Sequence, residues 1–147
     1  MKKLLLPFVI LLITSGCSVQ DEYFTWECSN VIKTTDTTDK IEKVVTYNNH
    51  DEVTNVVITR TFTAKNENGR DTLKSIKQSA KDYNNDLISD AIKVSIKEDT
   101  DKKYIIVYYL DVLKMTDKEL EYQNIKTDWL KYQNVLKKEK LSCKRKK

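Results

Sequence analysis

The sequence is poor in glycine, proline and histidine, and each shortage excludes a class of active site. Only two glycines and one proline occur among the 147 residues, and Gly69 is the only one of these three beyond residue 16. Phosphate-binding loops, dinucleotide fingerprints and nucleophile elbows each need several glycines, because the backbone must turn sharply or approach phosphate closely. The single histidine, His50, excludes the two-histidine HExxH zinc site. A hydrolase triad could use only His50, which we expect to be a solvated residue of a turn.

Three cysteines are present, and none forms a CxxC pair. Zinc ribbons and thioredoxin-type redox motifs are therefore excluded. No motif in the sequence indicates a metal site, a cofactor or a set of catalytic residues, so we expect a protein that is not an enzyme and uses no cofactor.

The charge distribution is uneven along the chain. The formal net charge is +4, and the last eleven residues hold seven basic side chains against Glu139. Without the two leader lysines and this tail, the chain is mildly acidic. That is not the broad basic face of a nucleic-acid-binding protein, and we expect no nucleic-acid partner.

The first sixteen residues have the pattern of an export signal. Lys2 and Lys3 precede an apolar run from Leu4 to Ile13, and small residues follow. The run is about ten residues long, whereas a membrane-spanning helix needs roughly 20.

The leader ends in Thr14-Ser15-Gly16-Cys17, which resembles the lipobox of bacterial lipoproteins. There, the cysteine sulfur receives a diacylglycerol and the cysteine becomes the new N-terminus. Thr14 departs from the aliphatic residue usual at its position, so simple secretion and an uncleaved anchor remain the alternatives. We expect residues 1–16 to be the signal peptide, Cys17 to be the lipidated and palmitate-bearing residue, and the protein to be held on the extracytoplasmic face of the cell membrane.

Lipidation of Cys17 would leave Cys28 and Cys143 on the oxidising side of the membrane, where disulfides form. We predict one disulfide between them, with two free thiols as the alternative. The bridge would hold the last helix beside the first strand.

Alternating apolar residues predict two β-hairpins separated by a long helix. The strands are expected at residues 24–33, 40–47 and 52–64, and then at 88–97 and 104–112, with the last of these at the centre of the sheet. On the strand at 52–64, Thr54, Val56, Ile58, Arg60 and Phe62 share one face. Residues 48–51 form a turn.

Helices are indicated by apolar spacing and by capping residues. Residues 65–70 are expected to form a loop, and Asp71 or Thr72 is expected to cap a helix that frays at residues 84–86. Its apolar stripe consists of Leu73, Ile76, Ala80, Tyr83 and Leu87. Thr116 and Glu119 form a capping box before a short helix. Asp128 is expected to cap a last helix, on which Trp129, Tyr132 and Leu136 share a face.

These elements predict an α+β fold: an antiparallel sheet built from two hairpins, with a long amphipathic helix between them and a C-terminal helix. After a tether at residues 17–23, residues 24–147 are expected to form a single domain with a basic C-terminal tail. The chain resembles the small YehR-like lipoproteins of Firmicutes in four features. They are a leader ending in Gly-Cys, the segment Trp26-Glu27-Cys28, the segment Met115-x-Asp117-x-Glu119-Leu120, and the terminal Leu141-Ser142-Cys143-Lys144. The resemblance implies a compact extracytoplasmic α+β domain on a lipid tether, and it assigns no catalytic residue.

Aromatic side chains are the main candidates for a binding surface. Tyr and Trp are favoured at interfaces, but a core of this size also needs them. The alternatives are therefore core packing and an aromatic platform for a glycan or peptide, formed by Trp26, Tyr104, Tyr108, Trp129 and Tyr132, with Tyr109 next to them.

Two oxygen-rich segments, Asn66–Asp71 and Glu98–Asp101, do not have the fixed spacing of a calcium loop, and we expect exposed turns. The basic tail at residues 137–147 is either solvated or in contact with anionic lipid or wall polymer.

The function expected from the sequence is that of a monomeric, membrane-anchored binding or scaffolding module of the cell envelope. The alternatives are a small secreted hydrolase that uses scattered carboxylates or His50, and an inhibitor or adaptor that docks another envelope protein.

Overall fold

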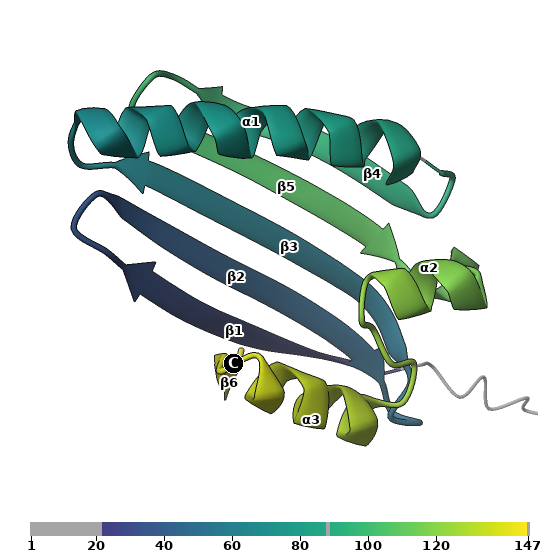
Figure 1. Ribbon diagram of the computed structural model, residues 1–147. Helices are drawn as coiled ribbons and strands as arrows, with labels where there is room; N and C mark the ends of the chain where they lie inside the picture. The colour runs from purple at the N-terminus through teal and green to yellow at the C-terminus, as the bar shows by residue number, and fades with distance from the viewer. Residues whose placement is uncertain (1–21, 88, 147) are drawn as a thin grey trace, which may run out of the picture.

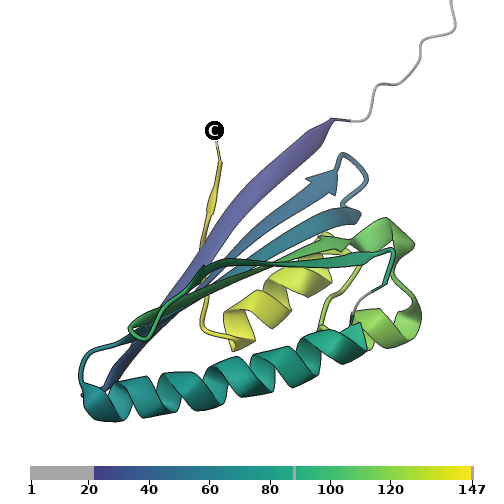
Figure 2. The same cartoon turned by 90° about the horizontal axis from the view of Figure 1, so that it is seen from above.

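The computed structural model describes residues 22–87 and 89–146. They form one antiparallel sheet of six strands in the order β4-β5-β3-β2-β1-β6, with the helices on one face of the sheet (Figures 1 and 2). The α+β class and the antiparallel sheet are thereby confirmed. The expected order of elements is met only loosely, because the first three strands form a meander, and a sixth strand and a 3₁₀ helix are added. The signal peptide, Cys17 and most of the tether lie outside the described residues.

The meander consists of β1 (Tyr23–Lys33), β2 (Thr37–Asn48) and β3 (Val53–Ala64). β2 is longer than the alternation predicts at both ends, whereas β1 begins one residue earlier than predicted and β3 begins one residue later. The predicted turn at 48–51 is present, and the Asn48 side chain accepts hydrogen bonds from the backbone N–H groups of His50 and Glu52. His50 is exposed in this turn, as expected.

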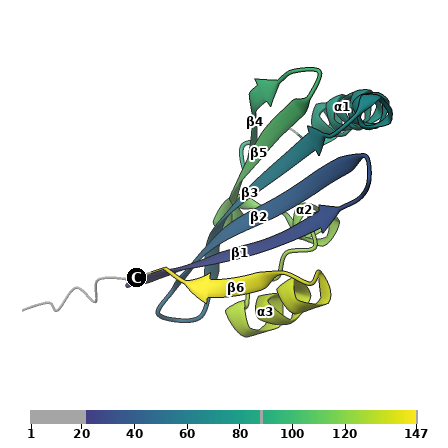
Figure 3. The ribbon, with the colours of Figure 1, turned by 90° about the vertical axis from the view of Figure 1, so that its left-hand side faces the viewer.

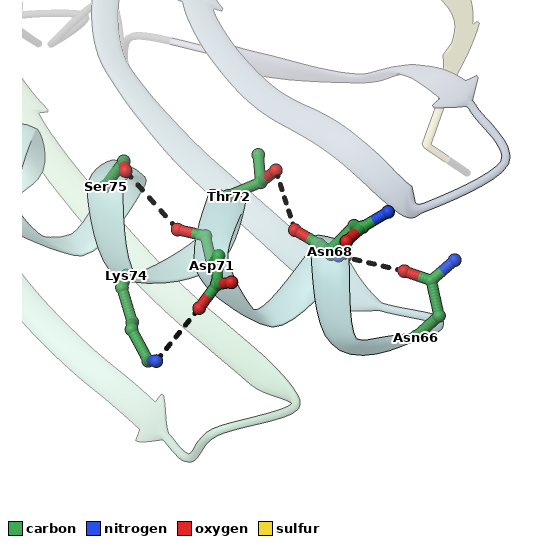
Figure 4. A network of polar contacts seen from close by, with 7 residues as sticks. Asn66, Asn68, Asp71, Thr72, Lys74 and Ser75 are labelled. Carbon is green, nitrogen blue, oxygen red and sulfur yellow. Dashed lines mark hydrogen bonds and ion pairs between the residues drawn. The ribbon is translucent and has the colours of Figure 1, made fainter.

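Helix α1 (Glu67–Leu87) begins five or six residues before the start that a cap at Asp71 or Thr72 predicts, so the expected loop at 65–70 is wrong at its C-terminal part. Asn66, rather than Asp71 or Thr72, provides the cap: its side chain accepts a hydrogen bond from the Gly69 N–H at 2.9 Å. The Asn66 amide nitrogen also donates to Asp36 Oδ1 at 2.7 Å, whereas two further contacts of this oxygen-rich segment lie within the helix. Figure 4 shows the Thr72 hydroxyl donating to the Asn68 carbonyl and Lys74 paired with Asp71. Gly69 therefore lies inside the helix.

The second hairpin is formed by β4 (Ile92–Asp99) and β5 (Lys103–Asp111), with its turn at residues 100–102. β4 starts later than predicted and includes Glu98 and Asp99, which we expected in the turn. β5 is interior, between β4 and β3, with Tyr104, Ile106, Tyr108 and Leu110 buried on the helix-covered face and Tyr109 exposed on the other.

The chain then forms a 3₁₀ helix, η1 (Val112–Lys114), and two short helices, α2 (Asp117–Tyr122) and α3 (Trp129–Lys138). The predicted capping box is present, because the Thr116 and Glu119 side chains each bond the backbone N–H of the other residue. Asp128 caps α3 by accepting from the Lys131 N–H, and the three residues predicted to share its face are all buried.

Part of the basic tail forms β6 (Ser142–Arg145), which sequence patterning did not predict. β6 pairs with β1 in antiparallel register, and Cys28 lies opposite Cys143. The predicted disulfide joins these two residues. The disulfide links β1 to β6 directly. It holds α3 beside β1 only indirectly, through the short connection between α3 and β6.

Register assigns each strand residue to one of two faces. The helix-covered face carries the row Trp26, Val45, Val56, Leu110 and Ile92 and, beside it, the row Cys28, Lys43, Ile58, Tyr108 and Val94. α3 packs over β1 and β2, where Trp129 stacks on Tyr47 with ring centroids 4.7 Å apart. α1 packs on the same face of the sheet but over β3 and β5, away from α3, and Figure 3 shows this helix end on. The sheet between the two helices forms the floor of the candidate site.

Candidate functional site

A cavity of about 710 Å³ lies between α1 and the helix-covered face of the sheet. We call it the groove. Its floor consists of alternate residues on three neighbouring strands, which register places side by side: Asp39, Ile41 and Lys43 on β2; Ile58, Arg60 and Phe62 on β3; Ile106 and Tyr108 on β5. Since alternate residues of a strand point to the same side, the three strands present one continuous and mainly apolar surface.

Helix α1 forms one wall of the groove. The two ends of its predicted stripe, Leu73 and Leu87, are buried. The middle residues, Ile76, Ala80 and Tyr83, are only partly buried, and all three line the groove. The helix therefore closes onto the core at both ends, while its central apolar residues face open space.

Aromatic side chains close the end of the groove at α2. The Tyr83 ring stacks on Tyr122 with centroids 5.5 Å apart and meets Tyr108 edge-on at 6.3 Å. The Gln123 amide nitrogen donates a hydrogen bond to the Tyr83 hydroxyl at 3.3 Å. Two of these hydroxyls are hard to ionise: burial raises the pKa of Tyr108 to about 12, and burial is also the main cause that raises the pKa of Tyr83.

An ion pair lies at the opposite end of the groove. Arg60 Nη2 is 2.8 Å from Asp39 Oδ2, and the side chains are 41% and 27% exposed. The guanidinium also lies 4.7 Å from the centroid of the Phe62 ring. Arg60 Nε and Asp39 Oδ1 are buried and have no hydrogen-bond partner among the described residues. The pair therefore keeps one donor and one acceptor that the protein itself does not use.

A second ion pair borders the groove on the side of α3. Lys43 Nζ is 2.5 Å from Glu139 Oε2, and the Lys43 side chain is only 5% exposed. Asn124 donates to the other carboxylate oxygen of Glu139 at 3.3 Å. Lys43 Nζ also lies 5.9 Å from the centroid of the Tyr132 ring. Both cations that line the groove are thus already paired with carboxylates.

The five aromatic residues considered as a platform do not come together at the surface. Tyr104, Tyr108, Trp129 and Tyr132 are buried, and Trp26 is partly buried against Trp129. For these residues the structure supports the core-packing alternative, except that Tyr108 also lines the groove. Tyr83 and Tyr122 belong to the site but were not predicted as binding residues. The stripe spacing indicated only that Tyr83 faces the sheet, and nothing in the sequence indicated Tyr122.

Neither a metal centre nor a membrane span is found in the part of the chain that the structure describes. Within residues 22–87 and 89–146, no three His, Cys, Asp or Glu side chains are placed to hold a metal ion. None of the described helices has both the length and the apolar character needed to cross a membrane.

Comparison with known proteins supports the fold only. No protein-family profile and no curated protein matches the chain. The chain is similar to a protein from Streptococcus pneumoniae TIGR4 whose structure was solved by NMR, with a TM-score of 0.50 and 13% identity over 98% of this chain and 97% of that one. At that identity the likeness concerns the arrangement of helices and strands and carries no functional residue across.

Proposed function

We propose that the protein is a non-catalytic binding module of the cell envelope, tethered to the outer face of the membrane through Cys17, and that its ligand lies in the groove. The groove carries the proposal. Its volume is in the range of sites that bury small ligands, and its lining is mainly apolar and aromatic with a few convergent polar groups, as such sites are. The two cations of the lining, Lys43 and Arg60, are paired with carboxylates. This arrangement suits holding a ligand better than acid–base chemistry.

The disulfide supports the proposed location. Bridges of this kind persist in oxidising compartments and are rare in the cytosol of most organisms. An export leader and a lipidated Cys17 would bring the chain to such a compartment. The YehR-like resemblance is in keeping with this proposal.

The direction of the chain also supports a role away from the bilayer. β1 starts at Tyr23, close in sequence to Cys17, and Tyr23 pairs with Asn48 on β2. Asp39, at the ion-pair end of the groove, lies nine residues before Asn48 on β2, or roughly 30 Å away at about 3.3 Å per residue. This end of the groove therefore lies far from Tyr23, the residue at which the tether would enter the sheet.

The groove can be tested by filling it. Ala80→Trp places an indole on the groove side of α1, whereas Lys81→Trp places the same ring on an exposed neighbour. The probe is anilinonaphthalene sulfonate, a dye that fluoresces in apolar sites. We expect saturable binding to the wild-type protein, at least tenfold weaker binding to Ala80→Trp and unchanged binding to Lys81→Trp, with circular dichroism confirming that both variants fold. Equal dye binding by all three proteins would refute the groove as the site.

The tether needs a separate experiment. In the native host, growth with a tagged fatty acid should label the wild-type protein in the membrane fraction and leave Cys17→Ala unlabelled. An unlabelled wild-type protein recovered from the cytosol with its leader attached would contradict the proposed location.

A further inference from the structure

The stretch from α3 to β6 exposes charges of one sign. Residues 129–146 all belong to the described part of the chain, and their exposed side chains comprise Leu130, Asn134, Ser142 and seven cations. The cations are Lys131, Lys137, Lys138, Lys140, Lys144, Arg145 and Lys146. The one side-chain carboxylate of this stretch, Glu139, is turned inward, because one of its oxygens contacts Lys43 and the other accepts from Asn124. We call the seven cations the basic surface.

Neighbouring elements neutralise the basic surface only in part. Glu27 on β1 lies 3.7 Å from Lys144 Nζ and 3.5 Å from Lys146 Nζ, so one carboxylate is shared by two lysines. Arg145 lies over the Phe24 ring, 4.6 Å from its centroid. Among the described residues, Lys144 and Lys146 are the two cations of the basic surface that form ion pairs. Most of its charge is therefore open to an anionic partner.

The basic surface lies beside the strand at which the tether would enter. α3 and β6 lie side by side at the β1 side of the sheet, away from α1 (Figures 1 and 3). β6 pairs with residues 26–29 of β1, and the Lys146 N–H donates to the Thr25 carbonyl. Six residue steps separate Cys17 from Tyr23, which is at most about 20 Å of extended chain. Acyl chains on Cys17 would thus keep these cations within reach of lipid headgroups.

Charge also distinguishes between the sides of the domain that could face a membrane. Tyr23 pairs with Asn48, so the 48–52 turn lies at the end of the sheet where β1 begins, and Asp51 and Glu52 are exposed there. A domain standing on this end would bring both carboxylates toward anionic headgroups, which repel them. A domain lying on α3 and β6 brings the basic surface to the headgroups, and α1, one wall of the groove, then lies on the side away from the bilayer.

We infer that the basic surface binds anionic phospholipid headgroups, so that the tethered domain lies with α3 and β6 against the membrane. The inference rests on the tether in the proposed function and not on the groove. Lys and Arg clustered near a lipid anchor are attracted by an anionic leaflet, and the acyl chains and the charges strengthen each other's hold. Leu130 is exposed among the cations of α3 and adds apolar contact at the headgroup boundary.

Vesicle flotation and lysine footprinting test the inference on the protein purified from its native host. One set of vesicles is phosphatidylcholine, and the other is an equal mixture of phosphatidylcholine and phosphatidylglycerol. Soluble polyphosphate is a third condition. An acetylating reagent modifies accessible lysines at low salt, and mass spectrometry gives the rate at each lysine.

Protection is expected at the basic surface and not elsewhere. Lys137, Lys138 and Lys144 should react at least threefold more slowly on the anionic vesicles than on the neutral ones. Lys102, in the turn between β4 and β5, and Lys118, on α2, should react equally on both. About 1 M salt should remove the difference, because it screens exposed charges beyond about 3 Å.

Two matched variants locate the contact. One carries Lys137→Gln, Lys138→Gln and Lys144→Gln, and the other carries Lys74→Gln, Lys102→Gln and Lys118→Gln on exposed positions of other elements. Both lose the same charge, and circular dichroism checks that both fold. Protection of Lys140 and Lys146 by anionic vesicles should fall at least threefold in the first variant and stay unchanged in the second.

Each other outcome overturns a defined statement. Flotation with both vesicles and equal reactivity on both would refute the inference and leave the tether standing, and protection by polyphosphate alone would assign the surface to a phosphate polymer instead. Flotation with anionic vesicles alone, at low salt, would uphold the inference and refute the tether. Flotation with neither would refute both. Protection that the first variant retains would place the contact elsewhere and refute the inference.

Discussion

Cys28 and Cys143 face each other across the antiparallel strands β1 and β6, with their Cα atoms 4.0 Å apart. Cys28 is buried in the core, whereas β6 is four residues long and pairs with β1 alone. The bridge spans 115 residues of sequence. The bridge therefore fixes the C-terminal strand to the core and closes a loop that contains nearly the whole domain.

Removing this bridge should lower the stability of the domain strongly. In the chain-entropy model, a closed loop of this length contributes about 4–5 kcal/mol, because it restricts the unfolded chain. We expect the Cys28→Ala/Cys143→Ala double variant, and the reduced wild-type protein, to melt roughly 10 °C or more below the oxidised protein. Differential scanning calorimetry measures this. Identical melting curves, with both thiols of the native protein open to alkylation, would contradict it.

We expect Gly69 to be required for stability, because its backbone lies too close to Asp36 to leave room for a side chain and not because it forms a turn. It lies within α1, its φ is not positive, and an ideal Cβ would be 2.1 Å from the Asp36 carbonyl oxygen. In an open helix, Gly→Ala stabilises by about 1 kcal/mol. At this site, overpacking of about 1–3 kcal/mol should exceed that gain.

We therefore expect Gly69→Ala to lower the free energy of unfolding in urea. Asn68→Ala, on the exposed neighbour, is the matched control and should leave it nearly unchanged. An equally stable or more stable Gly69→Ala protein would show that the contact relaxes without cost.

The same glycine shows where the sequence predicted the fold correctly and where it did not. The β3 alternation predicted that Ile58, Arg60 and Phe62 share a face, and they do, because the period of a strand is fixed by backbone geometry. The start of α1 was placed too late because the glycine was interpreted as a loop residue. Its actual role depends on Asp36, more than thirty residues earlier, and local sequence carries no signal for such a contact.

The groove was harder to predict for a related reason. The stripe on α1 showed which residues face the sheet, but not that its middle would remain open. That depends on the packing of α1 and α3 over separate parts of the sheet and on the position of Tyr122 in α2. β6 was missed because its basic residues are typical of a solvated tail. Its pairing with β1 and the disulfide outweigh that local preference.

The Lys43–Glu139 pair should respond asymmetrically to substitution. Lys43 is almost fully buried and Glu139 is 29% exposed. Glu139→Gln leaves a buried ammonium without its counter-charge, and we expect a loss of about 1–3 kcal/mol. Lys43→Met removes the buried charge and leaves Glu139 able to reach water, so the loss should be smaller. Urea unfolding of both variants measures the difference. A greater loss for Lys43→Met would mean that the ion pair itself stabilises the fold.

The buried tyrosines should make the protein unstable in alkali. Burial raises the pKa of Tyr108 from the ordinary 10.0 to about 12, and it also raises the pKa values of Tyr83, Tyr104 and Tyr132. Between pH 10 and 12 the unfolded chain therefore binds fewer protons at these hydroxyls than the folded chain does. The free energy of unfolding must then fall as the pH rises through this range, and it is unaffected by these groups below pH 10. Tyr108→Phe should flatten the decline, because phenylalanine keeps the ring and removes the ionisable hydroxyl. Thermal melts at a series of pH values, with tyrosinate absorbance recorded in parallel, measure both effects. An unchanged slope in Tyr108→Phe would mean that Tyr108 ionises at the same pH in the folded and unfolded chains.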